Sequence, residues 1–364
     1  MKMKLLSAVL LLVSFGALGI LSGAVPVMAE DTEPSAETVV TVTPTSEAEP
    51  IPTAPPSPSP ESIETLMTAE IPETAQLPEG TTPPVTWSPE PVITPEPVAE
   101  IVALAAADLW EPEAEVISTT ITASSPLDND TAYDVDVAAL WSPELNVTLS
   151  PDGYQVLIIH THATEAYTPD GDDRYEATDD YRTTDTAHSV VRVGQALADA
   201  LEAYGINVLH DTALYDYPGY NGSYARSGAA IEEYLAAYPG ISIVIDLHRD
   251  ALGDADTIYK TITSAAGETA AQIMFVMGSD VNLYHPNWRE NLQLAMGMQA
   301  LVEARYEHLT RPTILCDYRY NQQLTTGSLL MEVGTAGNTL QEAITAVELF
   351  ADVIGPVLAD RIAV

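Results

Sequence analysis

The sequence has few basic residues and almost no cysteine. Its 364 residues include 13 lysines and arginines against 53 aspartates and glutamates, which gives a net charge of −40. No lysine or arginine occurs between Lys4 and Arg174. This composition argues against nucleic acid as a partner, since binding phosphates requires a basic surface. The single cysteine, Cys316, excludes an internal disulfide and is interpreted as a small hydrophobic side chain rather than a nucleophile.

An apolar segment follows the first charges of the chain. It runs from Leu5 to Ala29 after Lys2 and Lys4, and a bilayer requires roughly 20 such residues. Because both positive charges precede the segment, the rest of the chain is expected outside the cytoplasm. Residues 1–29 are therefore predicted to be a signal peptide or a membrane anchor, and the protein is expected to be extracytoplasmic, either membrane-anchored or secreted.

Residues 30–115 are rich in proline, threonine, serine and glutamate. Such a segment has too little apolar surface to offset the entropy lost on ordering, and its prolines and like charges keep it extended. We predict a disordered acidic linker that holds the following domain away from the membrane. Residues 116–364 are expected to form that single folded domain.

Apolar runs alternate with helical patterns in this domain. The predicted strands are the run opening at Val156, then 206–210, 241–248, 271–277 and 328–334. The predicted helices are 188–204, 226–238, 287–306 and a last one that begins after a capping box of Thr339 and Glu342. This alternation predicts an α/β fold with a mostly parallel central sheet and helices on both faces.

Histidine and glutamate residues lie at or near the ends of three of these strands. The stretch VLIIHTHATEAY ends in His162 and Glu165, DLHRD contains His248, and LLMEVG contains Glu332. Parallel strands bring their carboxyl ends to one edge of a sheet, so the four side chains are expected to converge. Two histidines and one carboxylate leave one position of a tetrahedral shell open, which is the pattern of a catalytic zinc site.

Glu332 is predicted to act as the general base of this site. An acid inside an apolar strand is costly to bury unless it is paired, bound to metal or catalytic. The structural alternative is a buried ion pair with an arginine such as Arg249. Zinc lowers the pKa of bound water to about 7, so these residues would suffice to hydrolyse an amide.

Two other residues compete for the ligand positions. Asp185 is a rival third ligand, although a carboxylate before a helix is also stabilised by the helix dipole. His160 is a rival to His162, because residues two apart on a strand face the same way. The remaining histidines are interpreted as structural residues, including a possible helix cap at His188: His188, His210, His285 and His308.

Six stretches resemble one known family. HTHATEAY, VVRVGQALADALEAYGI, YNGSYARS, VIDLHRD, YRYNQQL and LLMEVGTAGNTLQEA occur in the order seen in stage II sporulation protein P, and they span nearly all of residues 150–350. The resemblance implies a zinc-dependent peptidoglycan hydrolase with amidase and endopeptidase activity, related in fold to the N-acetylmuramoyl-L-alanine amidases. Such proteins act between two membranes during sporulation engulfment, alongside a lytic transglycosylase and a membrane scaffold.

The resemblance also assigns residue roles. It implies zinc ligands at His162, Glu165 and His248 and a catalytic glutamate at Glu332 in residues 116–364. The chain departs from the family pattern at two auxiliary positions, with His188 in place of an expected asparagine and Tyr215 in place of a frequent histidine. Predicted substrate contacts, whose side chains suit carboxylates and glycan, are Arg249, Tyr318, Arg319, Asn321 and Gln322.

With the resemblance added, the predicted activity is cleavage of the amide between N-acetylmuramic acid and the stem peptide. The alternative is a non-catalytic protein of the cell wall that binds peptidoglycan or acts as a scaffold. The complete set of acid and histidine residues argues against it, because a binding module would tolerate the loss of Glu332.

Overall fold

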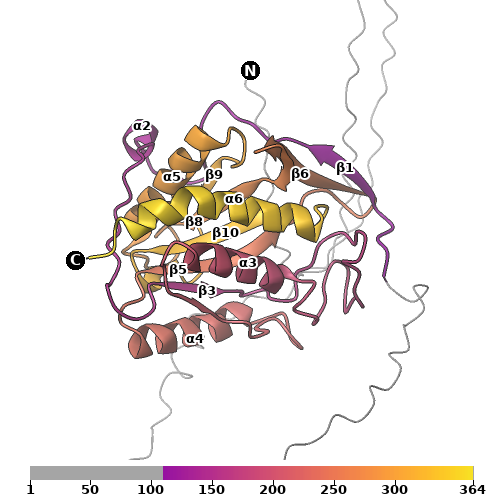
Figure 1. Cartoon of the computed structure of the whole chain (residues 1–364), viewed down its shortest axis with the longest axis horizontal. Coiled ribbons are helices and arrows are strands. Elements are labelled where there is room, and N and C mark those ends of the chain that lie inside the picture. Colours follow the sequence, from indigo (N-terminus) through magenta and orange to yellow (C-terminus); the bar gives the residue numbers. More distant parts are fainter. Residues whose placement is uncertain (1–109, 364) are drawn as a thin grey trace, which may run out of the picture. The chain divides into compact units, whose positions relative to one another are not determined.

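The computed structural model describes residues 110–363 (Figure 1). The predicted anchor at 1–29 and the predicted linker up to residue 109 lie outside the described residues, so the domain boundaries stay predictions. Within 110–363, none of the helices combines the length and the apolar character that crossing a membrane requires.

A seven-stranded central sheet organises this part of the chain. Its strands are, in sheet order, β2 (Leu127–Asn129), β9 (Thr313–Cys316), β8 (Ile273–Gly278), β10 (Ser328–Thr335), β5 (Ile243–Asp250), β3 (Val156–Ile159) and β4 (Val208–His210). Strands β10, β5, β3 and β4 pair in parallel, as do β2, β9 and β8. Strand β8 is antiparallel to β10, so the two groups run in opposite directions.

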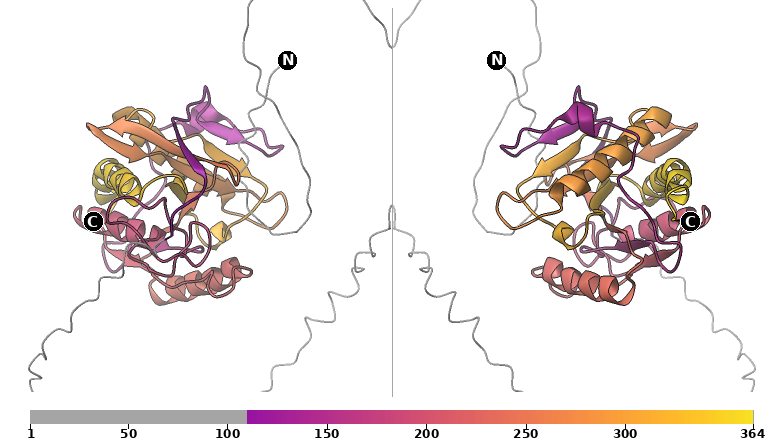
Figure 2. Two further views of the ribbon diagram at one scale, coloured as in Figure 1. Left: turned by 90° about the vertical axis from the view of Figure 1, so that its right-hand side faces the viewer. Right: turned by 90° about the vertical axis from the view of Figure 1, so that its left-hand side faces the viewer.

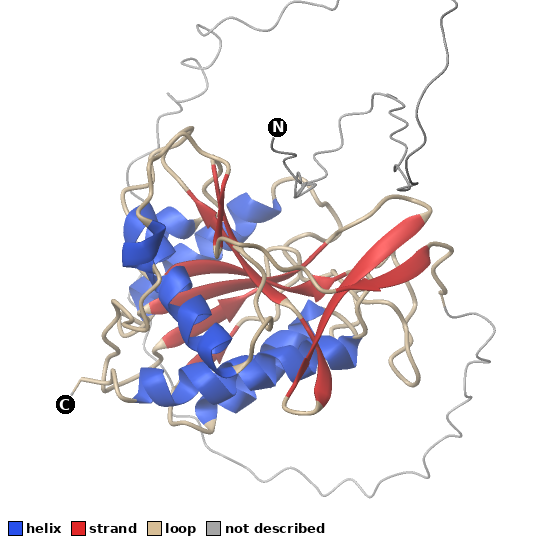
Figure 3. Cartoon of the chain, turned by 90° about the horizontal axis from the view of Figure 1, so that it is seen from above, coloured by secondary structure: helices blue, strands red, loops and turns tan. Residues whose placement is uncertain are grey.

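The sheet is therefore mixed, and the prediction of a mostly parallel sheet is corrected. The reason lies between β5 and β8, where the chain forms no helix but two strands of a second, three-stranded sheet. Strand β6 (Thr257–Ala265) pairs with β1 (Glu115–Thr119) in parallel and with β7 (Glu268–Ala271) in antiparallel fashion (Figure 3). A parallel return normally needs a helical crossover, which this connection lacks.

Three helices cover one face of the central sheet. They are α3 (Val190–Glu202), α5 (Trp288–Arg305) and α6 (Leu340–Ala359), and their apolar residues share one buried cluster with alternate residues of the strands. The predicted capping box at the start of α6 is present, because the Thr339 hydroxyl accepts from the Glu342 N–H and the Glu342 carboxylate accepts from the Thr339 N–H. Two shorter elements, α2 (Val137–Leu140) and the 3₁₀ turn η2 (Gln322–Leu324), complete the described helical structure.

The other face of the sheet is only partly covered. Helix α4 (Ser223–Ala237) packs through Ile231 onto Leu157, Ile159 and Val244 of β3 and β5, and it lies apart from the other helices (Figures 1 and 2). The apolar residues of β8, β9 and β10 on this face form a separate cluster that contains no helical residue. Helices therefore cover both faces of the sheet only at β3 and β5. On this second face, β8, β9 and β10 carry no helix within residues 110–363.

Candidate metal and catalytic site

The structure brings three of the predicted ligands together. Strand β3 ends at Ile159, and the following turn carries His162 and Glu165, while His248 lies on β5. Their potential ligand atoms lie within 4.8 Å of one another, and each residue is at most 5% exposed. Such a buried group of two imidazoles and one carboxylate could hold a divalent metal ion.

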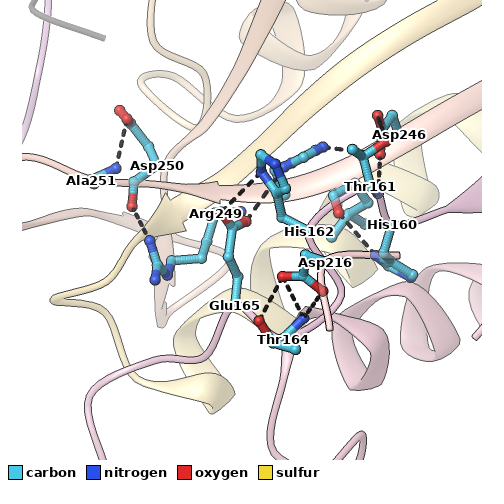
Figure 4. A network of polar contacts seen from close by, with 12 residues as sticks. His160, Thr161, His162, Thr164, Glu165, Asp216, Asp246, Arg249, Asp250 and Ala251 are labelled. Atoms are coloured by element: carbon cyan, nitrogen blue, oxygen red, sulfur yellow. Dashed lines mark hydrogen bonds and ion pairs between the residues drawn. The ribbon is translucent and has the colours of Figure 1, made fainter. Parts of the chain in front are cut away.

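Glu165 lies between the two histidines. Its Oε1 is 3.5 Å from Nδ1 of His162 (Figure 4). Its Oε2 is 3.4 Å from Nδ1 of His248. The other ring nitrogen of His248, Nε2, is 2.9 Å from Oδ1 of Asp246. Asp246 itself accepts hydrogen bonds from the N–H and the hydroxyl of Thr161, at 2.8 and 2.7 Å. The Asp246 carboxylate forms an ion pair with His248 at Nε2, so Nδ1, on the side of Glu165, is the ring nitrogen available to a metal, and this donor set fits zinc.

Electrostatics hold the buried charges of the cluster in place. Burial favours the neutral form of Glu165, but the two neighbouring histidines and the charge of Arg249 bring the pKa of Glu165 well below the ordinary value. Burial likewise disfavours the charged form of His248, but Asp246 and Glu165 raise the pKa of His248 well above the ordinary value. A metal binds only the neutral imidazole. A bound cation would therefore replace the proton of His248, and its positive charge would balance the carboxylates of Asp246 and Glu165.

Several residues that surround the cluster were not predicted from the sequence. Arg182 lies 3.4 Å from Oε1 of Glu165 and 2.8 Å from Asp216, and its guanidinium lies over the ring of Tyr220. Tyr220 stacks on His162 with ring centroids 4.6 Å apart, and Tyr224 meets the same histidine edge-on. The two tyrosines belong to YNGSYARS, one of the stretches that carry the family resemblance. Asp246 had a clear signal, because it lies two residues before His248 on one strand and so shares its face.

Glu332 lies on β10 in register with His248. It is 9% exposed, and its Oε2 has no hydrogen-bond partner among the described residues. Burial raises the pKa of Glu332 to about 8, with the charges of Asp250 and Glu165 acting in the same direction. A carboxylate with a pKa near neutrality can both accept and return a proton, as a general base requires.

The ion pair suggested as an alternative for Glu332 is not formed. The guanidinium of Arg249 donates to the carbonyl oxygens of Ala166 and Tyr181, at 2.9 and 3.0 Å. Its backbone N–H donates to Oε2 of Glu165 at 3.2 Å. Arg249 therefore contacts Glu165, a predicted metal ligand, and leaves the carboxylate of Glu332 unpaired within residues 110–363.

These residues line one cavity of about 250 Å³. His162, Glu165 and His248 lie on its wall together with Glu332, and Val276 and Leu330 of the uncovered sheet face extend it. The cavity thus places an unpaired carboxylate beside the cluster that could bind metal, with room for a substrate group.

The two rival ligands lie elsewhere. The Nδ1 of His160 is 2.8 Å from the carbonyl oxygen of Leu247, and its Nε2 is 3.0 Å from Nε2 of His210. The expectation that His160 and His162 face the same way was wrong, because β3 ends before either residue and the chain turns. Asp185 pairs with His188 at 2.9 Å and takes no part in the cluster, and the helix cap is the following residue, Ser189, rather than His188.

Four predicted substrate contacts lie outside the cavity. The amide of Gln322 bonds to the backbone of β8 at Val276 and Gly278, and that of Asn321 bonds to the carbonyl oxygen of Tyr224. Tyr318 is 60% exposed, and Arg319 donates to the carbonyl oxygen of Tyr284. These residues follow β9, which runs opposite to β10. The carboxyl end of β9 therefore lies at the opposite end of the sheet from the carboxyl end of β10. A direct substrate role for them, and for Arg249, stays a prediction.

The fold and the cavity define an α/β protein with a buried site able to bind a metal ion beside an unpaired glutamate. The family model of Stage II sporulation protein P (SpoIIP) matches residues 103–355, and the chain belongs to this family. Stage II sporulation protein P of Bacillus subtilis (strain 168) is 29% identical over 218 residues, which are 56% of this chain and 51% of that protein. The matched part thus spans about half the length of that relative.

Solved structures of amidases also resemble this chain. An N-acetylmuramyl-L-alanine amidase of Mycobacterium smegmatis matches with 14% identity and a TM-score of 0.33, over 58% of this chain and 98% of that one. The CwlD amidase of Clostridioides difficile, solved in complex with the GerS lipoprotein, matches with 15% identity and a TM-score of 0.32, over 57% of this chain and 98% of that one. At such scores the case for an activity rests on the residues of the site.

Proposed function

We propose that this chain is a zinc-dependent peptidoglycan hydrolase that cleaves the amide between N-acetylmuramic acid and the stem peptide. One observation carries the proposal: His162, Glu165 and His248 have ligand atoms within 4.8 Å of one another in a cavity that also exposes Glu332. Membership of a sporulation family supports peptidoglycan as the substrate. The same site would act on amides within stem-peptide cross-links, which is the endopeptidase activity expected from the sequence.

The residues of the site divide the chemistry among them. Zinc held by His162, Glu165 and His248 would polarise the substrate carbonyl and lower the pKa of water. Glu332 accepts the proton of the attacking water and passes it to the leaving nitrogen. Its burial among apolar residues of β10 and β8 keeps it a strong enough base near neutral pH.

Further residues hold this arrangement in position. Asp246 orients His248 from behind, and the Arg249 N–H and the guanidinium of Arg182 hold Glu165. Tyr220 stacks on the ring of His162 and shields it from solvent. Such support keeps the ligand atoms at the spacing that a single cation requires.

Digestion of purified sacculi tests the proposal. The zinc-loaded full chain is expected to release stem peptides with a free amino terminus and to leave intact glycan, and Glu332→Gln is expected to bind sacculi without releasing peptides. If wild type and Glu332→Gln bind sacculi equally and neither releases peptides, the protein is a binding module of the cell wall, which is the alternative function.

The cellular setting forms part of the proposal. The N-terminal segment would place the site outside the cytoplasm, in the space between the two membranes during engulfment. A lytic transglycosylase that cuts glycan would complement an amidase that removes stem peptides, and a membrane scaffold would hold both enzymes at the wall. Co-purification of the full chain from sporulating cells with and without residues 1–29 tests this arrangement.

A further inference from the structure

A second cavity lies on the uncovered half of the sheet. It has a volume of about 220 Å³, and the segment 121–125, Asp128, Met274 and Arg311 lie on its wall. Met274 of β8 is in register with Glu332 of β10. Neighbouring strands lie about 4.8 Å apart, so a substrate held at Glu332 needs to cross only one strand to reach this cavity.

Arg311 lies on the wall of this cavity and has one donor nitrogen without a hydrogen-bond partner among the described residues. The side chain is buried, and its Nη2 lies 2.7 Å from Oδ2 of Asp250 and 2.9 Å from the sulfur of Met274. Its Nη1 has no hydrogen-bond partner among residues 110–363. A buried guanidinium donor without a partner is costly, so a ligand in the cavity that accepts this hydrogen bond would gain affinity.

The Arg311 and Asp250 pair also joins the two cavities. Asp250 lies on the wall of the catalytic cavity, whereas Arg311 lies on the wall of the second one. A planar guanidinium with one edge held by Asp250 still presents its other nitrogen in a fixed direction, which suits a carboxylate.

The charges around Arg311 narrow the class of ligand. Asp128 lies on the wall of the same cavity, and Asp250 already neutralises Arg311. A simple anion would meet two acids and one arginine there, which is unfavourable. A group that carries an ammonium beside its carboxylate satisfies both Asp128 and the free donor of Arg311.

We propose that this second cavity is a subsite for a stem-peptide residue with a free carboxylate and ammonium on one carbon, as at the free end of a diamino acid. Arg311 takes the carboxylate and Asp128 takes the ammonium group. The subsite rests on the proposed function for the identity of its substrate. For cleavage of the amide to N-acetylmuramic acid, it makes the enzyme prefer stem peptides whose diamino acid is neither amidated nor cross-linked.

Binding of soluble stem peptides to the zinc-loaded full chain tests the subsite. The probes are a peptide with a free diamino-acid end, the same peptide amidated at that carboxylate, and the same peptide acetylated at that amine. With Glu332→Gln, which prevents turnover, calorimetry is expected to show the free peptide binding roughly tenfold or more tightly than either blocked peptide. Equal affinities for all three peptides would overturn the inference.

Variants assign the discrimination to its residues. The double variant Arg311→Met with Asp250→Asn removes the donor without leaving a buried charge, and it is expected to bind the free and amidated peptides equally. Arg192→Met, at an exposed position on α3, keeps the full discrimination. If the double variant does not fold, Asp128→Asn serves instead and is expected to lose the preference for the free over the acetylated amine; retention of that preference would contradict the proposal.

The outcomes also separate the subsite from the proposed function. If the protein distinguishes free from blocked peptides but the wild type does not hydrolyse sacculi, the subsite is supported and the hydrolase activity is refuted. Hydrolysis that proceeds without discrimination would sink the subsite alone.

Discussion

Two histidine pairs adjoin β3, one on each side of the central sheet, and their surroundings differ. His162 and His248 face two carboxylates, Glu165 and Asp246. His160 and His210 face each other near α3, where a Cβ added to Gly194 would lie only 2.5 Å from His160 Nε2. Burial gives His160 a pKa of about 3, with the charge of His210 acting in the same direction, whereas the carboxylates raise the pKa of His248. The acids, rather than the histidines themselves, mark the pair able to bind a cation.

The sharpest test of this difference is the metal content of the two pairs. His248→Ala is expected to lose zinc from a near-stoichiometric wild-type level and to lose all turnover, because one of three ligands is gone. His160→Gln is expected to keep its zinc even if its thermal midpoint falls. Elemental analysis of both variants under native conditions checks this. A folded His160→Gln protein without zinc would reverse the roles that we assign to the two pairs.

Replacing Glu332 tests whether the side of the sheet with the carboxylates is also the site of catalysis. Glu332→Gln is expected to lower kcat by roughly 10²- to 10⁴-fold, the usual effect of losing a general base, while zinc content stays unchanged. Peptide release from sacculi and zinc analysis on the same preparation measure the two effects. Unchanged turnover would remove Glu332 from the mechanism, and a parallel loss of zinc would make it a ligand.

Asp246 distinguishes an orienting carboxylate from a ligand. Asp246→Asn leaves the three ligands in place but removes the charge behind His248, and we expect zinc to bind roughly 10- to 100-fold more weakly. Competition with a chelator of known affinity measures the change. The matched control is Gln195→Ala, which removes the partner of His210 Nδ1 on the other side of the sheet and is expected to leave zinc affinity unchanged.

The smallest effect concerns His285, a third kind of histidine environment. Its ring is buried, neither ring nitrogen has a hydrogen-bond partner in the described part of the chain, and burial lowers its pKa to about 4, with Arg319 acting in the same direction. The unfolded chain takes up this proton near pH 6.5, so between pH 6.5 and 4 the unfolded state holds more protons than the native state. Stability is therefore lost as the pH falls through this window.

Replacing this histidine removes the effect. Relative to His285→Leu, the wild type is expected to lose on the order of 1 to 2 kcal/mol of unfolding free energy between pH 6.5 and 4, allowing for solvent screening. Urea unfolding at a series of pH values measures it. The exposed His308→Asn variant is the control and should follow the wild type at every pH. If the unfolding free energies of wild type and His285→Leu change with pH in the same way, His285 takes up its proton in the folded protein as readily as in the unfolded chain.

The sequence predicted much of this architecture because its patterns are local. Helices α3, α4, α5 and α6 begin within three residues of their predicted starts, and the capping box before α6 is formed. The direction of β8 could not be predicted in the same way, since it depends on what the chain does between Asp250 and Ile273. The absence of a helical pattern in that connection was the available signal.

In the candidate site, too, the residues with a local sequence signal could be predicted and the others could not. Motif residues such as His162 and His248 could be named, because polar groups at the ends of apolar strands are visible in one dimension. The choice between His160 and His162 could not be made, because it depends on where β3 ends. Arg182 and Tyr220 could not be placed at all, since only folding brings them next to Glu165 and His162.

The reversal of strand direction between β10 and β8 has a consequence for how this protein can change. The three predicted metal ligands lie on or after the parallel strands β3 and β5, and the proposed general base lies on β10. Arg311 of the proposed subsite reaches the same face from the segment that precedes β9. The proposed chemistry and the proposed recognition are thereby encoded in different stretches of the gene. Grafting residues 121–128 together with 308–321 from a family member that acts on a different stem peptide should transfer its preference and leave the proposed hydrolytic residues unchanged.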